Sequence, residues 1–264
     1  MADENKISIV VPILNEKDNI VTLLSEFDDL VSQCGLTALD EVIFVDDGSK
    51  DGTVDILKRH SQLQDFGHRY KITLLERDRK LGQVDACIAG SRLATNGTIA
   101  VMDSDLQHPP LTLTKMSSLM NGTVDIIAAS RHIVGGKRMW SPMRGVVSRV
   151  AILIAYIFVK PSRKLKDPTT GYFMTRKEYI TGLPPLAKRT KLLLYILSKN
   201  PDLKVMEVPY TFKDRKAGES KTVTKSPSFI IDYLIEILSY MRVGYRSKKA
   251  IKKSTDDIVA FRTR

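Results

Sequence analysis

The sequence predicts an α/β domain with a mostly parallel β-sheet that helices cover on both faces. Short, nearly continuous apolar runs alternate with segments of helical periodicity, as in parallel sheets buried on both sides. The chain has 264 residues, of which 43% are hydrophobic, so it is long enough to bury a sizeable core. These observations exclude a disordered chain and favour one large domain.

Strands and helices can be assigned in order along the first half of the chain. Residues 7–11 form an apolar, β-branched run that Pro12 ends, and residues 20–31 repeat apolar side chains with the spacing of an amphipathic helix. Later strands are expected at 41–45, 72–75, 99–102 and 124–128. Helices are expected between them at 53–61, 83–94 and 113–120.

The second half has a different texture. A strongly apolar, helix-length run spans 146–159, a turn spans 167–171, and strands are expected at 172–175 and 205–212. Residues 229–241 form a second amphipathic pattern, and a basic tail follows. Because basic residues flank both apolar segments, we expect C-terminal amphipathic helices that lie at the interface of an anionic membrane.

Charge is divided unevenly along the chain, whose net charge is +11. Residues 1–130 hold 12 basic and 20 acidic side chains, whereas residues 131–264 hold 29 and 10. This asymmetry points to an anionic partner of the second half: nucleic acid, a membrane or a phosphorylated substrate. Nucleic acid is disfavoured, because the basic residues are not interleaved with stacking aromatics and no nucleic-acid motif is present.

The cysteine content, the start of the sequence and the lengths of its apolar stretches bear on the cellular compartment. Two cysteines, Cys34 and Cys87, are too few for a disulfide framework and lack zinc-site spacing, which favours a reduced compartment. The polar start is unlike a secretory signal, and no stretch reaches the ~18 apolar residues of a membrane span. We therefore expect a cytoplasmic protein.

Acidic clusters follow two of the expected strands. Asp103 and Asp105, with Gln107 as a third oxygen ligand, can converge on a hard cation such as Mg²⁺ or Mn²⁺. Asp46 and Asp47 end another strand, where one carboxylate is expected to shape the turn and the other to face a ligand. In parallel sheets, ligands bind at these carboxyl ends of the strands.

These clusters belong to motifs that resemble a known family. Residues 9–16 (IVVPILNE), 45–53 (VDDGSKDGT) and 102–110 (MDSDLQHPP) resemble the inverting, nucleotide-sugar-dependent glycosyltransferases of the GT-A fold. Residues 130–131, 166–173 (KDPTTGYF) and 215–221 (RKAGESK) are similar to the polyprenyl-phosphate sugar synthases, the dolichyl-phosphate mannose synthases among them. The resemblance covers about residues 7–243.

The resemblance implies roles for individual residues. The metal on the donor diphosphate would be held by Asp103, Asp105 and Gln107. The nucleotide-sugar site would further include Pro12, Leu14, Glu16, Val45, Asp47 and Ser104. Phosphate groups of donor or acceptor would be contacted by Arg131, Lys191, Arg215 and Lys221, and catalysis would rest on Asp105, Arg131, Arg215 and Lys221.

The resemblance also implies an organisation and a reaction. Residues 1–243 would form the glycosyltransferase domain, with a nucleotide-sugar half (1–130), an acceptor and membrane half (131–243) and a basic tail (244–264). The expected reaction moves a hexose, best mannose from GDP-mannose, to a polyprenyl phosphate with inversion. The expected location is the cytoplasmic face of a membrane, and a separate membrane subunit is a further candidate partner.

Alternatives follow from departures of the sequence. Leu14 stands where these synthases commonly have Tyr, and Asp85 lies in a stretch that is usually richer in Gly and Ala. These changes leave UDP-glucose or UDP-N-acetylglucosamine open as donors. A hydroxyl acceptor in glycolipid or polysaccharide synthesis is also open and would need a carboxylate base. Asp167 is a candidate, although an Asp before Pro168 is more simply explained as a turn former.

Overall fold

The computed structural model describes residues 6–32, 39–63, 70–138, 142–183, 191–212 and 228–244. Within these ranges the predicted class is confirmed. One seven-stranded sheet has the order β3-β2-β1-β4-β7-β5-β8, and all its neighbouring pairs are parallel except those of β7 with β4 and β5. A second ladder pairs β6 with β9.

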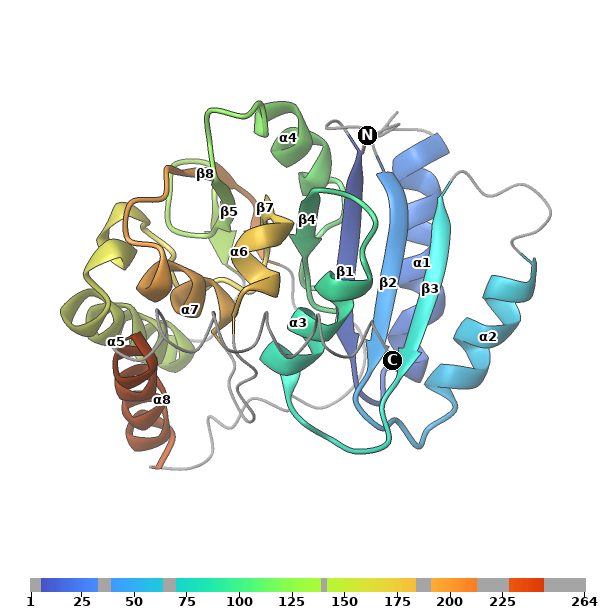
Figure 1. Cartoon of the computed structure of the whole chain (residues 1–264), viewed down its shortest axis with the longest axis horizontal. Helices are drawn as coiled ribbons and strands as arrows, with labels where there is room; N and C mark the ends of the chain where they lie inside the picture. Colours follow the sequence, from blue (N-terminus) through green and yellow to red (C-terminus); the bar gives the residue numbers. More distant parts are fainter. Residues whose placement is uncertain are drawn as a thin grey trace, which may run out of the picture.

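The strands lie close to their expected positions (Figure 1). Apolar side chains alternate between the two faces, so that Ile9 and Val11 of β1 enter one core and Val10 enters the other. Both faces are therefore buried, as the continuous apolar runs predicted. The strands are β1 (Ile7–Ile13), β2 (Leu39–Asp46), β3 (Lys71–Glu76), β4 (Thr98–Val101), β5 (Ile126–Ser130), β6 (Lys137–Arg138), β7 (Phe173–Arg176), β8 (Val205–Pro209) and β9 (Thr211–Phe212).

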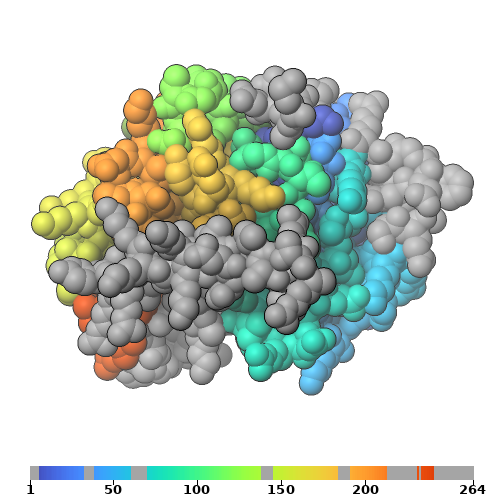
Figure 2. Space-filling model, viewed as in Figure 1, coloured from blue at the N-terminus to red at the C-terminus, as the bar shows by residue number. Residues whose placement is uncertain are grey.

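Helices cover the sheet on both sides. One face carries α1 (Lys17–Ser32), α2 (Thr53–Leu63) and α4 (Thr112–Leu119). The other carries α3 (Gln83–Leu93), α5 (Pro142–Phe158), α6 (Lys177–Thr181), α7 (Leu192–Lys199) and α8 (Ser228–Gly244), and a short 3₁₀ helix (Lys160–Lys164) follows α5. In the space-filling view, α8 (red) lies at the end of the molecule opposite α2 (light blue) (Figure 2).

Some expected elements have different limits. The single strand expected at 205–212 is wrong: Pro209 closes β8, and β9 pairs instead with β6 in the second ladder. Proline lacks an N–H group, and the N–H of Tyr210 turns to the carbonyl of Ser130. The helix expected at 146–159 begins earlier, at Pro142, a residue type suited to a first helical turn. Helices α6 and α7 were not expected.

The site end of the sheet is built where β1, β2 and β4 finish. Backbone hydrogen bonds join the residues beyond these strands: the N–H of Asp47 donates to Ile13, and the N–H of Met102 to Val10. Figure 1 shows the loops after β1, β2, β3 and β4 at the same edge of the sheet. The polar clusters are therefore neighbours, as the topology of parallel strands requires.

Candidate active site

The acidic pair after β2 has two different roles. Asp46 Oδ2 accepts the backbone N–H groups of Gly48 and Ser49, at 3.0 and 2.9 Å, so this carboxylate shapes the turn. Asp47 accepts the N–H of Leu81 at Oδ1 and that of Gly82 at Oδ2, both at 2.9 Å. Asp47 thus holds the loop before α3 against the end of β2.

Arg77 completes this corner of the site. Its buried guanidinium lies 3.3 Å from Asp47 Oδ1 and also pairs with Asp85 of α3. Sequence reasoning missed Arg77, because one basic residue after a strand carries no motif. Asp85, one of the positions at which this sequence departs from the family pattern, is the second partner of Arg77. Beside this corner is an open depression lined by Asp46, Gly48, Ser49, Lys50, Arg77 and Asp78, among others.

The other residues that were expected to line the nucleoside pocket lie near the carboxyl ends of β1 and β2. Glu16 is buried; its carbonyl accepts the N–H groups of Asn19 and Ile20 at the start of α1, and its backbone N–H donates to Thr53 Oγ1 at 2.9 Å. Val45 is fully buried beneath α3. Pro12 and Leu14 are half-buried at the end of β1.

The loop after β4 gathers the three expected metal ligands. Asp105 and Gln107 are buried, at 6% and 8% exposure, whereas the side chain of Asp103 is 33% exposed. Leu106 between them has φ +61°, a left-handed conformation that is rare for a branched side chain and typical of functional loops. Ser104 Oγ, 3.4 Å from the carbonyl of Pro12, ties the loop to β1.

Two neighbours hold Asp103. Gln83 Nε2 donates to Asp103 Oδ1 at 2.5 Å, and the backbone N–H of Asp103 donates to His108 Nδ1 at 3.2 Å. His108 stacks on Tyr172, with ring centroids 5.1 Å apart, and burial lowers the pKa of its imidazole. The histidine is therefore a neutral acceptor for the loop.

The donor set fits a hard divalent cation. Two carboxylates and an amide oxygen are the ligand types that Mg²⁺ and Mn²⁺ take, with water or phosphate completing the shell. A Cβ atom at Gly171 would stand 3.4 and 3.5 Å from the two carboxylate oxygens of Asp103, which is ordinary contact, so Gly171 lies directly beside this carboxylate. Among the described residues, no group of three or more His, Cys, Asp or Glu side chains is placed to hold a metal ion, and the expected set pairs two carboxylates with the amide of Gln107.

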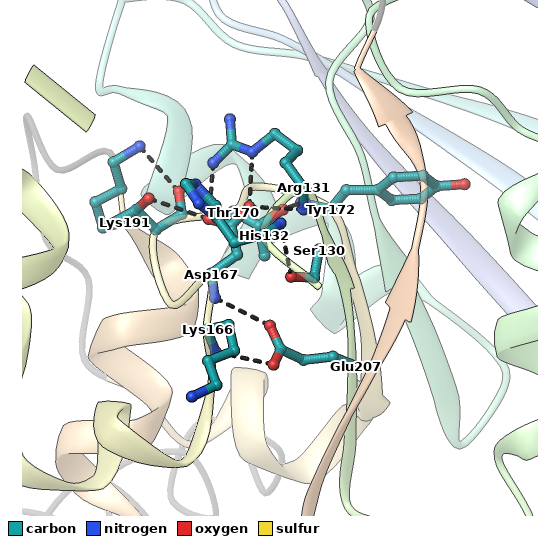
Figure 3. A network of polar contacts seen from close by, with 10 residues as sticks. Ser130, Arg131, His132, Lys166, Asp167, Thr170, Tyr172, Lys191 and Glu207 are labelled. Atoms are coloured by element: carbon teal, nitrogen blue, oxygen red, sulfur yellow. Dashed lines mark hydrogen bonds and ion pairs between the residues drawn. The ribbon is translucent and has the colours of Figure 1, made fainter. Parts of the chain in front are cut away.

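Arg131 and Asp167 form a buried ion pair next to this loop (Figure 3). Arg131 Nε lies 2.6 Å from Oδ2 and Nη2 lies 2.8 Å from Oδ1, and the backbone N–H of Arg131 adds a third bond to Oδ2. The Arg131 guanidinium holds the pKa of Asp167 below its ordinary value although burial opposes this shift. Asp167 is thus a poor candidate for the base that a hydroxyl acceptor would need.

Lys191 and Glu207 hold the turn that carries Asp167 (Figure 3). Lys191 Nζ donates to the carbonyl of Thr169 at 3.1 Å, and Glu207 accepts the backbone N–H groups of Lys166 and Asp167 at 2.8 and 2.9 Å. Burial, followed by the charge of Arg131, lowers the pKa of the Lys191 ammonium. Arg215 and Lys221, the other expected phosphate contacts, lie outside the described residues.

Helices α5 and α8 pack against each other, and each exposes apolar side chains. Tyr233 of α8 donates its hydroxyl to the carbonyl of Ala151 in α5 at 3.1 Å. Both helices expose apolar side chains spaced by three or four residues; we call them the apolar stripe: Val146, Val150, Leu153 and Ile157 of α5, and Ile231, Ile235 and Leu238 of α8. Among the described helices, none combines the length and apolarity needed to span a bilayer.

The fold and site together define a class of enzyme. A mostly parallel sheet presents the acidic loop that holds Asp103 and Asp105 at its carboxyl edge, with basic side chains beside it, as expected of a nucleotide-sugar-dependent glycosyltransferase. The chain belongs to glycosyl transferase family 2, whose model matches residues 8–182. It is therefore a glycosyltransferase.

Curated relatives share this family. The chain is 34% identical over 238 residues to a dolichol-phosphate mannosyltransferase of Pyrococcus furiosus, covering 90% of this chain and 64% of that protein's length. It is 31% identical to the dolichol-phosphate mannosyltransferase of Saccharomyces cerevisiae, covering 87% of this chain and 85% of the relative.

Solved structures support the GT-A-like fold. Glucosyl-3-phosphoglycerate synthase from Mycobacterium tuberculosis, in complex with Mg²⁺ and UDP, matches with a TM-score of 0.67. The match covers 89% of this chain and 79% of that one at 18% identity. A complex of the same enzyme with Mn²⁺, UDP and phosphoglyceric acid gives a TM-score of 0.64 and covers 88% and 78% of the two chains. At this identity the likeness establishes the fold.

Proposed function

We propose that this enzyme transfers mannose from GDP-mannose to a polyprenyl phosphate, with a divalent cation and with inversion at the anomeric carbon. The observation that carries this proposal is the pairing of Asp167 with Arg131. It makes Asp167 a poor base for a hydroxyl acceptor and holds the Arg131 guanidinium near Asp103 of the proposed metal-binding loop. The relatives named dolichol-phosphate mannosyltransferase support the choice of sugar and acceptor.

A phosphate acceptor suits this site because it needs no base. A phosphate monoester is largely ionised at neutral pH, since its second pKa is about 6. One of its oxygens attacks the anomeric carbon as the bond from that carbon to the diphosphate oxygen breaks. The nucleoside diphosphate leaves with the electron pair of the broken bond, and the configuration at the anomeric carbon is inverted. No proton transfer is required, so the protein must mainly position two anions and offset their repulsion.

The residues divide this task. Asp103, Asp105 and Gln107 would hold Mg²⁺ or Mn²⁺, which when bound would neutralise the donor diphosphate and stabilise the leaving group. Arg131 and Lys191 would offset the charge of the acceptor phosphate, and Arg215 and Lys221 are proposed to assist. The depression beside Asp46 and Arg77 is the proposed place of the nucleoside.

We also propose that the apolar stripe of α5 and α8 lies in a membrane surface on its cytoplasmic side. Basic residues of the same region are Arg149 in α5 and Lys160, Arg163 and Lys164 in the 3₁₀ helix that follows it. Apolar faces flanked by Lys and Arg bind anionic interfaces. An acceptor whose chain stays in the bilayer would then present its phosphate at the protein.

The test is a transfer assay with matched donors. The protein is incubated with Mn²⁺ or Mg²⁺, polyprenyl phosphate in vesicles, and labelled GDP-mannose, UDP-glucose or UDP-N-acetylglucosamine. We expect label from GDP-mannose in the lipid phase as a β-linked mannosyl phosphate, if the donor sugar is α-linked. Label from another donor would overturn the mannose assignment, and label that enters only hydroxyl acceptors would overturn the acceptor.

A further inference from the structure

Helix α8 reaches the candidate phosphate-binding lysine through two buried side chains. Glu236 is 6% exposed and Tyr240 is fully buried. The hydroxyl of Tyr240 donates to Glu236 Oε1, and the same oxygen accepts the backbone N–H of Lys191 at 3.2 Å. The Tyr240 hydroxyl also lies 3.4 Å from the carbonyl oxygen of Lys191. Both polar groups of the Lys191 backbone therefore face these two side chains of α8.

A buried carboxylate at this place has an energetic cost. Removing a charged group from water is unfavourable unless hydrogen bonds and opposite charge compensate it. The neighbours of Glu236 on the outer face of α8, Ile235 and Leu238, are exposed apolar residues, whereas Glu236 points inward. The buried face of α8 also contributes Ile237 and Tyr233 to the apolar core. An apolar side chain at 236 would continue that core, so packing alone does not account for a glutamate.

Lys191 is the residue on which this carboxylate acts. It precedes α7, which begins at Leu192, and its side chain extends to the turn that carries Asp167. One donor of the ammonium is used on the carbonyl of Thr169, and an ammonium has three. Burial and the charge of Arg131 lower the pKa of Lys191, and the negative charges of Glu236, Asp103 and Asp167 oppose this shift. Lys191 thus lies between α8 and the turn that carries Asp167.

We propose that Glu236 of α8 is a positioning residue that fixes Lys191 for contact with the acceptor phosphate. The carboxylate and Tyr240 fix the backbone at the start of α7, and the side chain of Lys191 then reaches the Asp167 turn. Because α8 also carries part of the apolar stripe, the element that would contact lipid is the one that holds this lysine. The inference rests on the proposed function, since it assigns Lys191 to that acceptor.

The experiment measures binding and turnover separately. Affinity for a short-chain polyprenyl phosphate is measured by calorimetry, together with kcat and KM for the same acceptor and the affinity for GDP with Mn²⁺. We expect Glu236→Ala to weaken acceptor binding and raise acceptor KM by roughly tenfold, with GDP affinity unchanged. Glu236→Gln, whose amide oxygen can accept the same hydrogen bonds, should stay within about threefold of wild type.

Two further variants keep the test decisive. Tyr240→Phe keeps the aromatic ring that stacks on Tyr195 and removes the hydroxyl, so a smaller weakening in the same direction is expected even if Glu236→Ala fails to fold. Glu178→Gln makes the same chemical change as Glu236→Gln on the exposed side of α6 and should change nothing. Unchanged acceptor affinity in Glu236→Ala and Tyr240→Phe would overturn the positioning role. If wild type itself binds no polyprenyl phosphate, the proposed function fails instead.

Discussion

Arg131 and Asp167 meet in a two-point ion pair that is buried on both sides, with 9% of the Arg131 side chain and none of the Asp167 side chain exposed. The guanidinium also lies 5.2 Å from the ring centroid of Phe212. The pair joins the end of β5 to the turn before β7, two segments 36 residues apart in sequence. Its geometry therefore fixes where the candidate phosphate-binding groups stand.

Asp167→Asn should destabilise the fold strongly. The asparagine leaves Arg131 buried without a charged partner, and breaking a buried pair in this way costs about 3–5 kcal/mol. Urea unfolding monitored by circular dichroism measures the change. Asp202→Asn, the same substitution at an exposed position, is the matched control and should have little effect. A loss below about 1 kcal/mol would contradict the view that the pair is structurally important.

The same pair should give a recognisable dependence on acid. The pKa of Asp167 is lowered from 3.8 in the folded protein, chiefly by its bonds to Arg131, which outweigh burial. A carboxyl group with a lowered folded pKa contributes stability above its unfolded pKa and loses it as the pH falls through the folded value. The stability difference between wild type and Asp167→Asn should thus be constant near neutrality and shrink below about pH 4. Urea titrations from pH 7 to pH 3 test this; a constant difference would argue against it.

A close contact between α3 and the sheet gives a second prediction about stability. A Cβ atom at Gly90 would come within 2.7 Å of methyl groups of both Val10 and Val45. Gly90→Ala should destabilise by about 1–3 kcal/mol through overpacking, more than the gain in helix propensity of up to about 1 kcal/mol. Gly145→Ala, in α5 with open space around it, should be neutral or stabilising. Adding Val45→Ala should recover part of the Gly90→Ala loss in thermal unfolding.

The fold was largely predictable because its strands are continuous apolar runs, and the loops after them carry distinctive polar residues. The position of the loop after β4 at the site edge of the sheet could be predicted from Asp103, Asp105 and Gln107, since parallel strands bring their carboxyl ends to one edge. The partners of these residues could not be read in the same way. Arg77 and Glu236 carry no motif, and their contacts join segments distant in the chain that only the tertiary structure brings together.

The membrane proposal predicts that α5 variants lose binding to lipid while keeping their fold. Leu153 and Ile157 are 58% and 55% exposed, and burying each in a lipid interface is worth up to about 1.5–3 kcal/mol. The double variant Leu153→Ser/Ile157→Ser should bind anionic vesicles more weakly. Its partition coefficient, obtained from the fraction of protein that floats with the vesicles, should fall at least about tenfold. Val21→Ser, at a residue 60% exposed on α1, should float like wild type. Equal flotation of all three proteins would contradict the proposal.

Asp105→Ala should separate metal binding from folding. Asp105 is buried and its Oδ1 accepts the N–H of Gln107 at 3.2 Å, so its loss removes one proposed ligand and loosens another. Binding of Mn²⁺, followed by calorimetry in the presence of GDP, should weaken at least about tenfold, and sugar transfer should fall by about a hundredfold or more. A chelator should abolish wild-type transfer, and added Mn²⁺ should restore it. Asp202→Ala controls for the loss of a carboxylate elsewhere. Because Mn²⁺ affinity is measured directly, an Asp105→Ala protein that folds, binds Mn²⁺ as wild type does and transfers sugar at the wild-type rate would overturn the assignment of this loop.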